Sequence, residues 1–283
     1  SAAEWGIPCM QRSETAIYYE IKSNCKQTIK YKDIKDKISF ETNSCKLREK
    51  EEYCLLIKDK TLSKIFFFGD SYTQNPYMEN NYNYLKFLSK ILRSNGKQFL
   101  DINYGLSGYS LNQNVYNLKN KLEKHSLAEQ DLVIFQFLAN DIYDINQHPP
   151  HPIKKYLNYS YIFRAANFVR RKVLYPNNQL SLRSQIINDY QKEASKFILN
   201  DKLCELSEYV AEKKINLIFL YLPYMEMRTD WHGEKENIFV ENLVLQNAKE
   251  CDISNILSLT NEFKKYDFNE LILSTQNHHL NKT

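Results

Sequence analysis

The amino-acid sequence predicts an α/β fold in which helices cover both faces of a parallel sheet. Short, continuous apolar runs such as Lys64–Phe68 and Asp131–Leu138 have the composition of strands that are buried on both faces. Between them lie longer amphipathic stretches such as Tyr82–Arg93, where apolar residues recur at helical spacing and Asn95-Gly96 provides a stop. Strands and helices that alternate in this way form parallel sheets.

Later segments continue the alternation. We expect strands at Gln98–Asn103, Ile215–Leu222 and Ile256–Leu259, and helices at Leu111–Glu123, Ser184–Lys213 and Glu236–Glu250. Trp231, which follows the fourth strand, is expected to pack within a loop.

The domain organisation follows from a change in composition near residue 60. Residues 1–60 are polar, carry cysteines and are only weakly periodic, so we expect an N-terminal extension there. Residues 61–283 form the predicted main domain, and an irregular segment near 147–178 is expected to be an insertion or lid.

Composition excludes several classes of protein. The 283 residues are 43% hydrophobic and 25% charged, as in ordinary globular proteins. The net charge of +4 is small and dispersed, which argues against a nucleic-acid partner. No apolar run approaches the length of about 18 residues that indicates a membrane span. The chain opens without a charged and apolar leader, so we expect any signal peptide or anchor to lie outside it.

The sequence contains six cysteines, and none has the close spacing of a zinc site. An even number suits disulfides, which would stabilise an extension that has few apolar runs, although six reduced and buried thiols are the alternative. Disulfides would place the protein in an oxidising, extracytoplasmic compartment. The spacing favours Cys9 with Cys25, Cys45 with Cys54, and Cys204 with Cys251, while sequence alone leaves other connectivities open.

Two candidate functional segments follow the first two predicted strands. Gly69-Asp70-Ser71 comes directly after the first strand, where a tight turn would present the serine at the carboxyl edge of the sheet and leave its backbone N–H free. Gly108 follows the second strand, and its missing side chain would let a backbone N–H approach a substrate. Taken singly, a Gly-Asp-Ser tripeptide is most often a plain turn, and the alternative for the Gly108 segment is an ordinary strand-to-helix loop.

Two further segments complete the pattern. Asn140 ends the third strand, where its amide could donate into the same cleft or cap a helix. His278 and His279 follow the last predicted strand, from which an imidazole could return to the serine. The four types occur in the order Ser, Gly, Asn, His, and three of them stand at successive strand ends.

In these four blocks the chain resembles the SGNH (GDSL) hydrolase superfamily: GDSY contains Ser71, SGY contains Gly108, AND contains Asn140, and HHLN contains His279. The resemblance covers about residues 62–283 and implies a flavodoxin-like three-layer α/β/α sandwich with about five strands. It also implies that Ser71 is the nucleophile and His279 the general base. The Ser71 N–H, the Gly108 N–H and the Asn140 amide would form the oxyanion hole. No metal or cofactor is implied.

The chain departs from the family pattern at two positions. The family usually has a glycine two residues before the asparagine, and this chain has Leu138. It usually has an aspartate three residues before the histidine, and this chain has Gln276; with His278 as an alternative base, that position holds Thr275. The candidates for orienting the imidazole are the amides of Gln276 and Asn277, a backbone carbonyl, the carboxylates of Asp267 and Glu270, and a charged residue of the insertion.

The function implied is acyl-ester chemistry through an acyl-enzyme, with an acetyl group passing to or from a cell-surface glycan. Cys45 and Cys54, followed by Lys64–Ser71, also resemble periplasmic SGNH domains fused behind acyltransferase-3 membrane domains, which acetylate polysaccharides. That resemblance implies a periplasmic or cell-surface location, and a membrane acyltransferase domain as partner and tether.

Three points stay open in the sequence. The missing aspartate leaves as an alternative a non-catalytic glycan-binding or partner-docking module on an SGNH scaffold. His148 and His151 have a metal-like spacing, but no acidic or cysteine partner is near, so we expect a proline-rich surface loop there. The family usually continues beyond the histidine block into a glycine and a terminal helix, so we expect either an early end or a cut at Thr283.

Overall fold

The computed structural model of the chain describes residues 9–13, 15, 17, 19–31, 34, 36–142, 182–223, 231–274 and 277–280. The predicted insertion near 147–178, with His148 and His151, lies outside the described residues.

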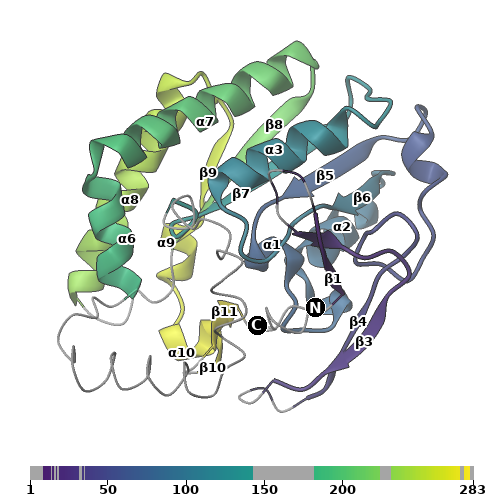
Figure 1. Cartoon of the computed structure of the whole chain (residues 1–283), viewed down its shortest axis with the longest axis horizontal. Helices are drawn as coiled ribbons and strands as arrows, with labels where there is room; N and C mark the ends of the chain where they lie inside the picture. Colours follow the sequence, from purple (N-terminus) through teal and green to yellow (C-terminus); the bar gives the residue numbers. More distant parts are fainter. Residues whose placement is uncertain are drawn as a thin grey trace.

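A five-stranded parallel sheet forms the centre of the molecule, in the order β6-β5-β7-β8-β9 (Figure 1). Numbered by their sequence order within the sheet, the strands run 2-1-3-4-5, which is the flavodoxin-like order. The predicted fold class is therefore confirmed. The strands are β5 (Lys64–Phe68), β6 (Leu100–Asn103), β7 (Leu132–Leu138), β8 (Asn216–Leu222) and β9 (Ile256–Ser258).

Helices cover both faces of this sheet. Right-handed crossovers place the helix between β5 and β6 on one face, and the helices that follow β6, β7 and β8 on the other. On the second face α3 packs against α7, and α7 packs against α8 (Figure 1). The main helices are α2 (Tyr84–Ser94), α3 (Leu111–Leu122), α6 (Leu182–Gln191), α7 (Glu193–Glu212) and α8 (Trp231–Glu250).

The remaining elements are short. The 3-10 helices are η2 (Leu56–Lys58) and η3 (Asn80–Tyr82), and α1 (Ser71–Gln74) is a single turn. After β9 come α9 (Thr260–Phe263), α10 (Phe268–Leu271) and an antiparallel hairpin of β10 (Ile272–Ser274) and β11 (Asn277–Leu280).

Two predicted helices need correction. The region predicted as one helix from Ser184 to Lys213 is two helices, because Lys192 has an extended backbone, with φ −76° and ψ 130°. The prediction of a loop at Trp231 was wrong, since α8 begins at that residue. Gly233 lies in the first turn of α8, where the tertiary structure tolerates a residue that disfavours helix.

The core explains the apolar run that marks the first strand. Every residue of β5 is buried, and Phe66, Phe67 and Phe68 have no exposed surface. Side chains of successive strand residues point to opposite faces, so a strand lined by helices on both sides must be apolar throughout.

The N-terminal extension consists of two antiparallel strand pairs, held by disulfides. The pairs are β1 (Met10–Arg12) with β2 (Tyr19–Ile21), and β3 (Lys26–Ile29) with β4 (Ile38–Glu41). The disulfides are Cys9–Cys25, Cys45–Cys54 and Cys204–Cys251, so all three predicted pairs are confirmed and no cysteine is free. Disulfides persist in oxidising compartments, so these bonds indicate an extracytoplasmic environment.

The extension packs against the main domain, beside β6 and α2 (Figure 1). Leu47 and Ile57 belong to the core that surrounds the sheet. A second, smaller cluster joins Ile17 and Ile21 of the extension to Leu106 and Tyr109 of the loop after β6. The boundary near residue 60 stays a prediction.

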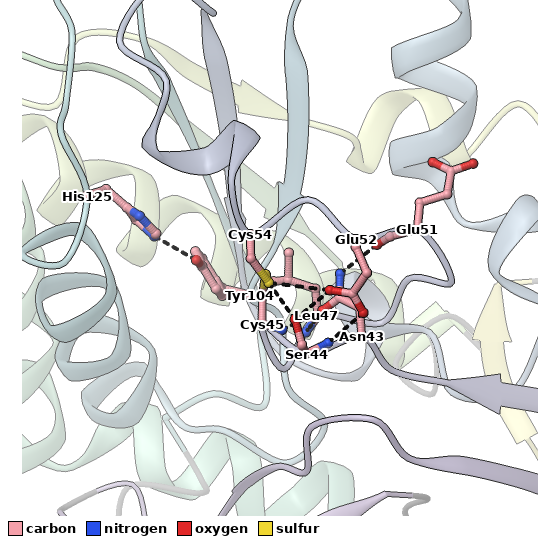
Figure 2. The surroundings of a disulfide bond; sticks show 9 residues. All are labelled: Asn43, Ser44, Cys45, Leu47, Glu51, Glu52, Cys54, Tyr104 and His125. Carbon is pink, nitrogen blue, oxygen red and sulfur yellow. Dashed lines mark hydrogen bonds between the residues drawn. A yellow bond between two sulfur atoms is a disulfide. The ribbon is translucent and has the colours of Figure 1, made fainter.

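The Cys45–Cys54 disulfide lies beside the Glu52 carboxylate (Figure 2), and the two sulfur atoms and a carboxylate oxygen lie within 4.8 Å of one another. Such a cluster resembles a set of metal ligands, but metals bind thiolates and these sulfur atoms are bonded to each other. The carboxylate instead accepts a hydrogen bond from the Ser44 N–H at 3.1 Å. The group is therefore part of a cross-linked loop.

None of the helices in the described ranges is both long and apolar enough to cross a membrane.

Candidate active site

Ser71 is the first residue of α1 and follows the central strand β5 at its carboxyl end. Asp70 is the N-cap of α1, and its Oδ1 accepts a hydrogen bond from the Tyr72 N–H at 3.0 Å. This cap ends the extended backbone and starts the helical turn at the serine. The half-buried Ser71 therefore stands at the edge of the sheet where parallel α/β folds bind ligands.

Gly69 allows the turn to pack closely. A Cβ atom at this position would lie 2.4 Å from Thr73 Oγ1 and 2.5 Å from the side-chain amide of Gln136. Both neighbours are fully buried, so a larger residue would displace the turn that carries Ser71.

Asp70 precedes Ser71 and is almost completely buried. Burial raises the pKa of its carboxyl group to about 6, although hydrogen bonds from the Tyr72 N–H, the Ser71 hydroxyl and the Ser71 N–H oppose the shift. The distance from Ser71 Oγ to Asp70 Oδ2 is 3.3 Å, which is long for a hydroxyl donor. The sequence predicts a free Ser71 N–H, but in the structure this group donates a hydrogen bond to the Asp70 carboxylate.

We predict that Asp70 makes stability depend on pH in an unusual direction. Its folded pKa of about 6 exceeds the ordinary value of 3.8, so the folded protein binds the extra proton between these values and loses stability as pH rises through them. In Asp70→Asn this loss is absent. The unfolding free energy of wild type minus that of the variant should therefore fall by about 2 kcal/mol from pH 4 to pH 7.

Urea unfolding of both proteins at the two pH values measures this double difference. The comparison cancels the titration of the other carboxyl groups. A difference that is the same at both pH values would contradict the prediction.

Gly108 lies in the loop between β6 and α3, and its φ of +79° is a backbone conformation that favours glycine. It is exposed, whereas Ser107 and Tyr109 on either side of it are buried. No described residue accepts a hydrogen bond from the Gly108 N–H. The structure thus leaves available the donor that the sequence predicts at this position.

The loop of Gly108 is hydrogen-bonded directly to the segment that contains Ser71. The Leu106 N–H donates to the Gly69 carbonyl at 2.9 Å, and the Ser107 N–H donates to Gln74 Oε1 at 3.0 Å. These bonds fix the two strand-end loops relative to each other.

On the other side of β5, the buried Gln136 of β7 connects a second strand to the turn of Ser71. With its amide nitrogen facing the turn, Gln136 donates to Asp70 Oδ1 at 3.1 Å and to Thr73 Oγ1 at 2.7 Å. The turn of Ser71 is therefore hydrogen-bonded to both neighbouring strands or their loops.

Asn140 lies two residues beyond the end of β7 and is half-buried. Its Oδ1 is buried without a partner, and no described residue accepts a hydrogen bond from its Nδ2. A buried amide oxygen without a partner is uncommon in a stable fold, so Asn140 has an unused hydrogen-bonding atom at this strand end. Leu138, in place of the usual glycine, is buried in the core, and its N–H donates to Asp141 Oδ2 at 3.0 Å.

Ser71, Gly108 and Asn140 thus follow three adjacent strands of the sheet, with the serine on the central one. Asn277, His278 and His279 lie in β11, whose hairpin with β10 is beyond the carboxyl end of the sheet, on the side of α1 (Figure 1). Only the backbone of β11 is described, and Thr275 and Gln276 lie outside the described residues. The roles assigned to these residues stay predictions.

The two carboxylates offered as orienting groups lie close to this hairpin in the chain. Asp267 and Glu270 are exposed and immediately precede β10. The Asp267 N–H donates to Glu270 Oε2 at 3.3 Å, so the pair is part of the turn that opens α10.

Sequence reasoning missed Arg48 of the extension, which donates hydrogen bonds to the backbone at the end of the turn of Ser71. Arg48 is 2% exposed, and its guanidinium donates to the carbonyl groups of Gln74, at 2.8 Å, Asn75 and Met78. It also lies over the Phe40 ring, 4.7 Å from the centroid. These carbonyl groups are at the end of α1 and in the loop after it, so Arg48 fixes the helix that carries Ser71. Its position in a polar, charged segment gave no signal of this role.

Comparison with known proteins finds no protein family model and no curated protein that matches the chain. Among solved structures it is similar to a member of the lipolytic protein G-D-S-L family from Veillonella parvula, with 14% identity and a TM-score of 0.45, covering 78% of this chain and 90% of that one. It is also similar to the esterase EstA from Pseudoalteromonas sp., with 13% identity and a TM-score of 0.45, covering 78% and 88%. A third is AlinE4, an SGNH-hydrolase family esterase, with 16% identity and a TM-score of 0.41, covering 73% and 83%.

Proposed function

We propose that the protein is an SGNH-type serine esterase that acts through an acyl-enzyme on Ser71. One observation carries the proposal: a serine at the end of the central strand lies between two strand ends at which Gly108 and Asn140 have polar groups without partners among the described residues. The Gly108 N–H and the side-chain amide N–H of Asn140 are the donors that an oxyanion formed at Ser71 would use in this proposal.

In the proposed reaction, Ser71 Oγ attacks the carbonyl carbon of an ester while a base takes its proton. The tetrahedral oxyanion accepts hydrogen bonds from the Gly108 N–H and the Asn140 amide, and from the Ser71 N–H once it turns from Asp70. Collapse expels the alcohol and leaves an acyl group on the serine, and a second nucleophile then releases it. Hydrogen bonds from both flanking strands hold the turn in place for these steps.

The substrate we propose is an O-acetylated or acetyl-accepting glycan at the cell surface. Three disulfides support an extracytoplasmic site of action. Whether water or a sugar hydroxyl attacks the acyl-enzyme decides between esterase and O-acetyltransferase, and we include a membrane acyltransferase domain as the proposed acetyl source for transfer.

The test is labelling with a fluorophosphonate followed by peptide mapping, and then product analysis with an acetyl ester and a glycan acceptor. We expect one phosphonylated residue, Ser71, and acetate or acetylated glycan as product. An unlabelled Ser71 in folded protein would overturn the proposal and favour the non-catalytic module.

The adjacent histidines provide a matched pair for identifying the base. We predict that His279→Ala lowers kcat for p-nitrophenyl acetate by about 10³-fold, because the serine loses the group that takes its proton. His278→Ala, one residue away, should retain most of the activity. The opposite ranking would assign the base to His278. Wild-type activity in both variants would exclude both histidines.

A further inference from the structure

The hydroxyl group of Tyr19 bonds the N-terminal extension to the loop that carries Gly108. Tyr19 is the first residue of β2, and its Oη donates to the Ser107 carbonyl at 2.8 Å. A Cβ atom on Gly108 would lie 2.9 Å from Tyr19 Oη, so the tyrosine hydroxyl is in close contact with the glycine.

This carbonyl belongs to the same peptide unit as the Gly108 N–H. In a planar trans peptide the C=O and N–H bonds point in opposite directions, and the structure contains no cis peptide bond in its described parts. A hydrogen bond that fixes the direction of the Ser107 carbonyl therefore fixes the direction of the Gly108 N–H, which points away from Tyr19.

Tyr19 is itself held firmly. The hydroxyl of Tyr109, the residue after Gly108, donates a hydrogen bond to the Tyr19 carbonyl at 2.6 Å. The centroids of the two tyrosine rings are 5.2 Å apart. The two tyrosines thus bond the extension and the loop reciprocally. The Cys9–Cys25 disulfide closes the segment that contains Tyr19.

We propose that Tyr19 is a positioning residue that aims the Gly108 N–H at the oxyanion, so that the extension forms part of the catalytic apparatus. The inference rests on the function proposed above. Loss of a whole oxyanion-hole donor costs about 10²–10³ in kcat; a donor that remains but is no longer held in direction should cost less, about tenfold.

The test compares Tyr19→Phe with Tyr31→Phe. Tyr31 is a matched control, because it is a tyrosine of the extension whose hydroxyl also donates to a carbonyl of the main domain, that of Pro76 at 3.4 Å. We expect kcat for p-nitrophenyl acetate to fall about tenfold in Tyr19→Phe, with KM unchanged, and both constants to stay at wild-type values in Tyr31→Phe. Rates are expressed per phosphonylated serine, so that unfolded molecules do not count.

A spectroscopic readout reports on the peptide directly. Ser107-Gly108 is the only Ser-Gly dipeptide in the sequence, so protein with ¹³C-carbonyl serine and ¹⁵N-glycine gives a single carbonyl-correlated amide resonance, that of Gly108. This resonance should move in Tyr19→Phe and stay in Tyr31→Phe.

If the wild type is active but Tyr19→Phe leaves the Gly108 resonance or kcat unchanged, the inference about Tyr19 is wrong and the proposed function still stands. A wild type that neither hydrolyses the ester nor reacts with the fluorophosphonate would overturn the proposed function, and with it the catalytic role of Tyr19.

Discussion

Ser71→Ala is expected to lower hydrolysis of p-nitrophenyl acetate by at least about 10³-fold in kcat/KM, because the acyl-enzyme can no longer form. The effect should be chemical and not structural. Ser71 begins α1 and is half-buried, and Asp70 caps the helix through the Tyr72 N–H, which the substitution leaves in place. We expect the thermal midpoint to change little.

The matched control is Ser94→Ala, at the exposed end of α2, where the hydroxyl donates only to the Ile91 carbonyl of its own helix. This variant should be fully active. If Ser71→Ala keeps wild-type turnover and Ser94→Ala does too, the hydrolysis belongs to another group and the assignment of the nucleophile is wrong.

Arg48→Met is expected to produce the largest loss of stability among the substitutions considered. Burial lowers the pKa of Arg48 to about 10, so the guanidinium is still charged at neutral pH and serves three backbone carbonyl groups. Methionine fills much of the space but leaves those acceptors buried without donors. We expect the unfolding free energy to fall by about 3 kcal/mol and the thermal midpoint by about 5–10 °C.

Lys50→Met, two residues along, is the control, because the side chain of Lys50 is 74% exposed and its ion pair with Glu41 spans 3.9 Å. Its midpoint should change by less than about 1 °C. Thermal unfolding followed by circular dichroism measures both variants. Equal midpoints for the two variants would show that the hydrogen bonds from Arg48 to the three carbonyl groups do not contribute to stability.

The sheet could be predicted from sequence because each strand is buried on both faces and leaves a continuous apolar run. The predicted β7, for example, differs from the observed strand only at Asp131. The break at Lys192 could not be predicted, since no glycine or proline marks it. Tertiary packing, and not local propensity, ends α6 there.

The sequence likewise predicted some residues of the candidate site and missed others. Ser71, Gly108 and Asn140 stand at strand ends that the sequence pattern locates, so their common edge could be predicted. Tyr19 and Arg48 contact that edge through bonds between residues far apart in the chain, such as Tyr19 with Ser107. Local patterns carry no information about such contacts, and both residues lie in a segment that is polar and weakly periodic.

The strand order has a consequence for how the protein matures. The central strand β5 pairs with β7, so that Ile65 lies opposite Leu132, and Tyr19 of the extension bonds to Ser107, 88 residues along the chain. Contacts of such long sequence separation slow folding, because loop-closure entropy opposes them until many form together. Recovery of ester turnover during refolding should therefore coincide with the final, slowest kinetic phase, in which these distant contacts form together.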